Sequence, residues 1–118
     1  MPLKDLDTLR RSDLVKRIVS VSFDGVGDSY RLKIRVELKN AWLMDLWEHK
    51  TPELRRYSYH VFHGEKMIVR WDNAPHFKNI ATFPHHKHED DKIKESSDMT
   101  VNLVLRELRK IVKITTQF

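Results

Sequence analysis

The 118-residue chain contains no cysteine. It therefore has no disulfide, no thiolate nucleophile and no zinc site built on cysteine, which is compatible with a reducing compartment. It also lacks an apolar run long enough to span a membrane, and its first residues, MPLKDLDTLRRSDLVKR, carry charges where a secretory signal needs an apolar centre. We therefore expect a cytoplasmic protein with no membrane segment.

Internal repeats, low-complexity segments and linkers are absent too, so residues 1–118 are expected to form a single domain with one core. Lysine and arginine total 22 against 17 aspartate and glutamate, which gives a formal net charge of +5. This balance favours contact with a polyanion such as a nucleic acid, although it does not require one.

Alternating apolar and polar residues predict antiparallel strands in the first half of the chain. In residues 30–38 the apolar side chains share one face and the charged ones the other, as in a strand with one buried face. Val19, Val21 and Phe23 alternate with serines, and residues 24–28 supply turn chemistry between the two strands. The two segments therefore predict a hairpin.

Three more segments fit the same sheet. Residues 41–48 fit a strand or a short helix, because both of their faces carry apolar groups. Residues 54–62 alternate around Tyr57 and Tyr59, and residues 63–66 close a tight hairpin into residues 67–72. The expected sheet is an antiparallel meander of four to five strands.

Helices are expected at the two ends of the chain. The leucines near the start of the chain lie among charged residues and have the spacing of a short amphipathic helix. Near the other end, the stripe of one helix face is formed by Val101, Val104, Leu105, Leu108, Ile111 and Val112. Ser96 or Ser97 can cap that second helix. Strands between terminal helices predict the α+β class, with the C-terminal helix packed on one face of the sheet.

Four of the seven histidines follow the point where the last predicted strand stops, near Asp72. Residues 73–75 end the strand, because asparagine bonds its own backbone and proline lacks an N–H group. The four histidines are His76, His85, His86 and His88. Imidazole can exchange a proton near neutral pH, bind a metal or donate to phosphate, so this loop is the expected place for chemistry.

The stretch YSYHVFHGEKMIVRWDNAPHFKNIATFPHHKH combines a tyrosine-rich strand, an R-x-D-N turn and an H-H-x-H cluster. Over residues 57–97 the sequence resembles the core signature of the TumE-like toxin family. The resemblance implies the toxin of a prokaryotic type II toxin–antitoxin module, which acts on RNA or translation and pairs with a DNA-binding antitoxin. The positions that it carries over are Tyr59, Arg70, Asp72, Asn73, His85, His86 and His88.

Independently of that resemblance, the residue types suit an endoribonuclease that needs no metal. RNA cleavage needs a base for the ribose 2′-hydroxyl, an acid for the leaving oxygen and cations for the phosphorane charge. On an extended segment His86 and His88 share a side, so we expect this pair to be the acid and base. Arg70 would hold the phosphate and Asp72 would orient an imidazole. The candidate catalytic residues are His86, His88, His85, Asp72 and Arg70.

Other side chains are candidates for substrate binding. Tyr57 or Trp71 can stack on a base. The charged face of residues 30–38 is by default a solvated surface, and it becomes an RNA track or an antitoxin-docking surface only if it is contiguous with the histidines. The candidate substrate-binding residues are Arg70, Lys87, Asn73, Tyr59, Trp71, Lys33 and Arg35.

Two other functions stay open. One is a toxin without enzymatic activity that blocks an RNA or protein target by occupying it. The other is a metal-dependent nuclease or transferase that uses the histidine cluster. The histidine spacing follows no standard zinc pattern, so we expect no metal or other cofactor.

The same residues also have structural interpretations. The histidines can form a solvated loop, the tryptophans can be core residues, and Asp72 with Asn73 can simply form a turn. An exposed patch that involves Trp42 and Trp47 would mark an antitoxin-docking surface. A homodimer is compatible with the sequence, but nothing in the sequence supports one.

Overall fold

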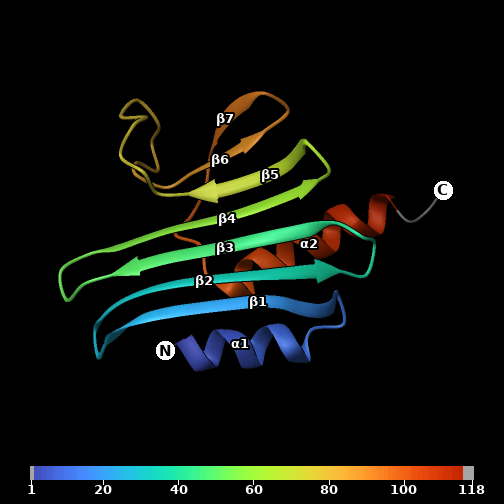
Figure 1. The fold of residues 1–118 in the computed structure, drawn as a ribbon. Helices are drawn as coiled ribbons and strands as arrows, with labels where there is room; N and C mark the ends of the chain where they lie inside the picture. Colours follow the sequence, from blue (N-terminus) through green and yellow to red (C-terminus); the bar gives the residue numbers. More distant parts are fainter. Residues whose placement is uncertain (1, 116–118) are drawn as a thin grey trace.

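The computed structural model describes residues 2–115, in which two helices flank seven strands (Figure 1). In chain order the elements are α1 (Pro2–Arg11), β1 (Val15–Val26), β2 (Ser29–Leu38), β3 (Leu43–Lys50), β4 (Arg55–His63), β5 (Lys66–Asp72), β6 (His86–Glu89), β7 (Lys92–Glu95) and α2 (Val101–Thr115). The strands form one antiparallel meander sheet in the order β1 to β7. The α+β class is confirmed, and neither helix is long and apolar enough to span a membrane.

The predicted number of four to five strands is wrong, because β6 and β7 add two short strands to the sheet. Each has four residues, HKHE and KIKE, too few and too polar to show an apolar alternation. Asp90 and Asp91 join them with positive φ angles of 55° and 59°. A two-residue turn of this kind is usually signalled by Asn-Gly, so Asp-Asp concealed the hairpin.

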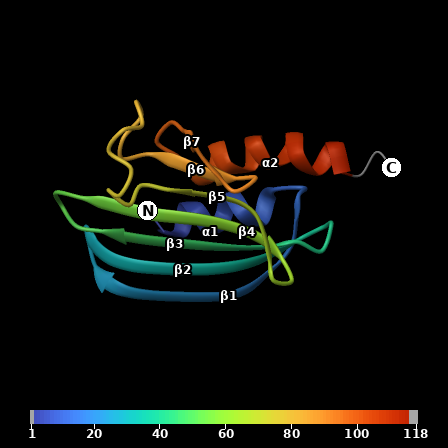
Figure 2. The same cartoon turned by 90° about the horizontal axis from the view of Figure 1, so that it is seen from above.

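The hydrophobic core lies on one face of the sheet. Strand β2 shows the predicted alternation, with every second side chain buried from Tyr30 to Leu38. Leu9 of α1 and Val104 and Leu108 of α2 are fully buried against this face. Figure 2 shows both helices on the same side of strands β1 to β3. The opposite face is covered by neither helix.

Strand β1 is the outer strand of the sheet and is more exposed than its pattern predicts. Val19, Val21 and Phe23 are 39%, 44% and 50% exposed. Although β1 pairs with β2 along its length, no strand lies on its other side among the described residues. Apolar alternation correctly predicts the strand, but it cannot tell an edge strand from an inner one.

Helix α2 begins after Thr100, not after the predicted serine caps. The Thr100 carbonyl accepts a hydrogen bond from the N–H of Val104 at 2.9 Å, and its hydroxyl accepts one from Leu103 at 3.4 Å. Asp98, just before the helix, instead accepts a hydrogen bond from Arg55 of β4 at 3.0 Å. The segment that leads into α2 is therefore attached to the sheet by an ion pair.

Candidate active site

Strands β5 and β6 bring four of the five candidate catalytic residues, Arg70, Asp72, His86 and His88, onto the uncovered face of the sheet. Strand β5 ends at Asp72, where the carboxylate accepts a hydrogen bond from the N–H of Ala74 at 3.0 Å. In the antiparallel pair, His86 lies opposite Asp72 and His88 lies opposite Arg70. Because alternate residues of a strand share a face, these four side chains converge.

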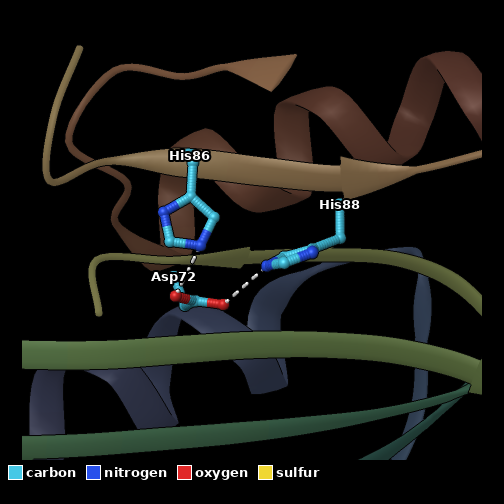
Figure 3. Close-up of side chains that lie close together, drawn as sticks. All are labelled: Asp72, His86 and His88. Atoms are coloured by element: carbon cyan, nitrogen blue, oxygen red, sulfur yellow. Dashed lines mark ion pairs between the residues drawn. The ribbon is translucent and has the colours of Figure 1, made fainter. Parts of the chain in front are cut away.

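The carboxylate of Asp72 is at the centre of the cluster. Figure 3 shows His86 and His88 pointing from β6 toward its two oxygens, with Nε2 of His86 2.9 Å from Oδ1 and Nε2 of His88 3.4 Å from Oδ2. Arg70 donates from Nε to Oδ2 of Asp72 at 3.0 Å and from Nη2 to Nε2 of His88 at 3.1 Å. The carboxylate thus accepts a hydrogen bond from the guanidinium and lies within 3.4 Å of both imidazoles.

His86 is buried, with 2% of its surface exposed. Its Nδ1–H donates to the Pro84 carbonyl at 2.9 Å, so in the neutral ring Nε2 carries the lone pair. That buried Nε2 has no hydrogen-bond partner, although Oδ1 of Asp72 is 2.9 Å away. A lone pair and a carboxylate repel at this distance, so the contact is favourable only with a proton or a metal ion between the two atoms.

His88 is held in the neutral state. The N–H of Arg70 points at Nε2, which places the lone pair there and the proton on Nδ1. Burial, followed by the charge of Arg70, lowers the pKa of His88 below its ordinary value of 6.5, and Asp72 opposes this only in part. A neutral imidazole at neutral pH is what a general base requires.

The cluster opens into a hollow of about 380 Å³ on the uncovered face. The Phe77 ring closes one side, with its centroid 4.8 Å from that of His86 and 5.7 Å from that of His88. His76 is exposed and lines the same hollow. Further side chains that line it are those of Trp47, Arg56, Ser58 and Asn73. A space of this size falls within the range of about 300–1,000 Å³ that is usual for small-molecule sites.

A family model described as Toxin TumE matches residues 5–117, nearly the whole chain. The chain belongs to the TumE toxin family. No curated protein and no solved structure matches it. The family model extends the resemblance of residues 57–97 to both ends of the described fold, and membership in a toxin family implies an antitoxin partner.

The cluster in this TumE-family toxin also has the donor set of a metal site. Ligand atoms of Asp72, His86 and His88 lie within 4.8 Å of one another, and zinc accepts two imidazoles and a carboxylate. The hydrogen bond from His86 to a backbone carbonyl is typical of metal-bound histidines. However, Arg70 uses lone pairs of Asp72 and His88 that an ion would need. Its side chain is 38% exposed and has room to turn away.

Four candidate residues point away from the face that carries the hollow, which corrects their expected placement in this TumE-family toxin. Trp71 and Tyr59 are each 2% exposed and belong to the core on the other face of the sheet. His85 faces the Tyr57 hydroxyl at 2.7 Å, and Lys87 pairs with a glutamate of its own strand. Successive side chains of a strand point to opposite faces of the sheet. Residues next in sequence to the cluster residues, such as Trp71 and Lys87, therefore point away from the hollow. Trp71 therefore cannot stack on a substrate base.

Asn73 lines the hollow, but its side-chain amide forms hydrogen bonds with backbone groups. It donates to the carbonyl of Arg55 at 2.7 Å and accepts from the N–H of Tyr57 at 3.0 Å. These bonds fasten the loop after β5 to strand β4. We therefore assign Asn73 a positioning role rather than a substrate contact.

Lys33 and Arg35 lie on the uncovered face in β2, three strands away from Arg70 and Asp72 in β5. Arg35 is neutralised by two hydrogen bonds to Asp45, at 2.7 and 2.8 Å. Trp47 lines the hollow on this face, whereas Trp42 packs against the core on the other. The two tryptophans of this TumE-family toxin therefore cannot form the single docking patch that was expected.

Sequence reasoning missed Phe77, Arg56, Ser58 and Trp47 as parts of the hollow. Phe77 lies in the loop after β5. Strand pairing places Trp47 beside Ser58 and Ser58 beside Asp72, and Arg56 lies two residues before Ser58 on the same face of β4. The alternation in β3 and β4 could have identified these residues, if the register of the hairpins had been counted outward from Asp72.

Proposed function

We propose that this toxin is an endoribonuclease that needs no metal, with His88 as its general base. The observation that supports the proposal best is the convergence of a neutral imidazole and a guanidinium on one carboxylate beside an open hollow. A neutral base and a cation next to it are two of the three parts that phosphodiester cleavage needs.

The proposed reaction begins when a substrate phosphate attracts Arg70 away from His88. Nε2 of His88 is then free to take the proton of the ribose 2′-hydroxyl. The 2′-oxygen attacks phosphorus, the bond to the 5′-oxygen breaks, and a 2′,3′-cyclic phosphate forms. His76, exposed in the same hollow, protonates the leaving 5′-oxygen, while Arg70 stabilises the phosphorane charge.

This assignment gives His86 a different part from the one expected from the sequence. Both of its ring nitrogens face protein atoms and its side chain is buried, so a substrate cannot reach it. In the proposal His86 is a positioning residue that packs against Asp72, Asp72 accepts a hydrogen bond from Arg70, and Arg70 donates another to His88.

To test the proposal, purified protein is incubated with a labelled single-stranded RNA, and the products are analysed for cyclic phosphate ends. We expect cleavage by the natural chain, and a loss of about 100- to 10,000-fold in His88→Ala, the usual contribution of an acid–base residue. His63→Ala is the matched control, because His63 is exposed at the far end of the β4–β5 hairpin. The proposal is wrong if the RNA stays intact both with and without added metal ions.

A metal-dependent nuclease is the second candidate, favoured by the buried Nε2 of His86 beside an acidic oxygen. It is separated from the first by treating the protein with a chelator and then adding Zn²⁺, Mn²⁺ or Mg²⁺. Cleavage that survives chelation supports the metal-independent reaction. Cleavage that disappears and returns with one ion supports the metal-dependent reaction, for which Asp72, His86 and His88 are the proposed ligands.

A toxin that only occupies its target would behave differently in cells. Its toxicity would survive His88→Ala but decrease when Lys33 is changed to glutamate. A ribonuclease loses toxicity with His88→Ala.

A further inference from the structure

A second hollow lies on the uncovered face beside the first. It has a volume of about 460 Å³ and lies over strands β1 to β3. The polar and aromatic side chains that line it are Ser20, Ser22, Lys33, Arg35, Asp45 and Trp47. Trp47 lines both hollows, so its indole is the boundary that they share.

Strand register connects the two hollows in a straight line across the sheet. Asp72 lies beside Ser58, Ser58 beside Trp47, Trp47 beside Lys33, and Lys33 beside Ser22. All five are on the uncovered face, since each pair is directly opposite in neighbouring strands. With about 4.8 Å between strands, Lys33 lies roughly 14 Å from Asp72.

The charges along this line favour an anion. Lys33 is exposed and has no ion pair among the described residues, whereas the nearby Arg35 is neutralised by Asp45. Arg56 lines the first hollow and donates one N–H to the Asn73 carbonyl, which leaves its charge unpaired by any acid among residues 2–115. Cations therefore lie on both sides of a half-buried tryptophan.

We propose that single-stranded RNA crosses the sheet along this line, with one base stacked on Trp47 and a backbone phosphate at Lys33. The proposal rests on the proposed function, because it assumes that RNA is the substrate of the hollow. An aromatic ring on an open sheet face stacks on unpaired bases, whose faces are hidden in a duplex. The line therefore selects single strands and sets which nucleotides flank the cleaved bond.

Binding to the His88→Ala variant tests the line without interference from cleavage. The measurement is the fluorescence anisotropy of a labelled single-stranded RNA and of its duplex, over a series of salt concentrations. We expect Trp47→Leu to weaken single-strand binding about 5- to 150-fold, the equivalent of about 1–3 kcal/mol for a stacked base. Trp47→Phe keeps a ring and should retain most of the affinity.

Lys33→Gln should reduce the slope of log affinity against log salt by about 0.7, the value for one phosphate contact with a single strand. Lys92→Gln is the matched control, because Lys92 is exposed on β7 outside this line. The melting temperature of each variant should match that of the parent, which separates lost contacts from lost folding.

The outcomes separate the two proposals. Cleavage by the natural chain together with unchanged binding by Trp47→Leu and Lys33→Gln would overturn the line and leave the ribonuclease standing. Binding that depends on Trp47 and Lys33, without cleavage by the natural chain, would support the line and overturn the ribonuclease. Duplex RNA that binds as tightly as the single strand, or no RNA binding at all, would also overturn the line.

Discussion

At the scale of single residues, burial lowers the pKa of the proposed base, and Arg70 lowers it further. Its charge is the second cause, after burial, that lowers the pKa of His88. Arg70→Gln removes this cause, so the pKa of His88 rises toward its ordinary value while burial still lowers it. We expect the acidic limb of the kcat/KM profile to move to higher pH, because His88 must be neutral to act.

The profile of RNA cleavage against pH checks this shift, even though Arg70→Gln also lowers the maximal rate. Arg56→Gln serves as the control, since Arg56 lines the same hollow, whereas the main causes of the pKa shift of His88 are burial, Arg70, Asp72 and His86. An acidic limb that stays in place in Arg70→Gln would show that His88 is not the titrating base.

Asn73 offers a test of positioning at the same scale. Asn73→Ala leaves the Tyr57 N–H and the Arg55 carbonyl without their partner, and we expect the free energy of unfolding to fall by about 2–4 kcal/mol. Asn79→Ala, at an exposed position in the same loop, should change it by less than about 0.5 kcal/mol. Urea unfolding measures both, and equal effects would contradict the role assigned to Asn73.

Which histidines share a side could be predicted from sequence, since residues two apart in an extended segment face the same way. His86 and His88 do so, with ring centroids 4.8 Å apart, and His85 points to the other face. The burial of His86 could not be predicted, because it depends on β6 joining the sheet and on Phe77 folding over it.

At the scale of elements, Arg55 fastens the segment before α2 to the sheet. Its guanidinium donates to Glu48 at 2.6 Å, to Asp98 at 3.0 Å and to the Met99 carbonyl at 3.0 Å. Arg55→Ala leaves the Glu48 carboxylate buried without its cation. We expect a loss of about 3 kcal/mol in the free energy of unfolding, near the lower end for a broken buried pair.

The matched substitution is Arg17→Ala, which breaks the more exposed pair with Glu37. It should cost less than about 1 kcal/mol, because water screens such pairs. Chemical unfolding of the two variants provides the comparison. If both cost the same, the network at Arg55 does not stabilise the attachment of α2.

Helices and strands whose apolar residues recur at a regular spacing could be predicted from the sequence. Strands that form only because they pair with a neighbouring strand could not. Strand β5 ends at Asp72 as expected, and residues 64–65 form the predicted tight turn, with Gly64 at a φ of 61°. The histidines up to His88 were expected to lie in a loop, but residues 86–95 contain β6 and β7. These two strands form because the edge of β5 offers hydrogen bonds, a tertiary effect that overrides weak local preference.

At the scale of the whole molecule, all three tyrosines of the chain are buried in one core. Burial raises the pKa of Tyr57 to about 12 and moves the pKa values of Tyr30 and Tyr59 upward as well. The unfolded chain ionises its tyrosines near pH 10, so the stability that these side chains contribute is complete below that pH and is lost as the pH rises above it.

We therefore expect a stability plateau up to about pH 10 and cooperative unfolding above it, accompanied by the absorbance of tyrosinate. Circular dichroism and ultraviolet absorbance, recorded on the same samples, should change together. The chain in urea, as a control, should ionise near pH 10. Tyrosinate that forms near pH 10 while the protein stays folded would contradict the burial of these rings.

The strict order of the strands has a consequence for synthesis. Every strand pairs with the one made just before it, so a nascent chain on the ribosome can assemble the sheet progressively from β1 onward. The two imidazoles that face Asp72 belong to β6, and the helix that seals the apolar side comes after them. In a growing polypeptide the cluster around Asp72 is therefore incomplete through most of translation. The cell that makes the protein meets a finished toxin only near the end of its synthesis.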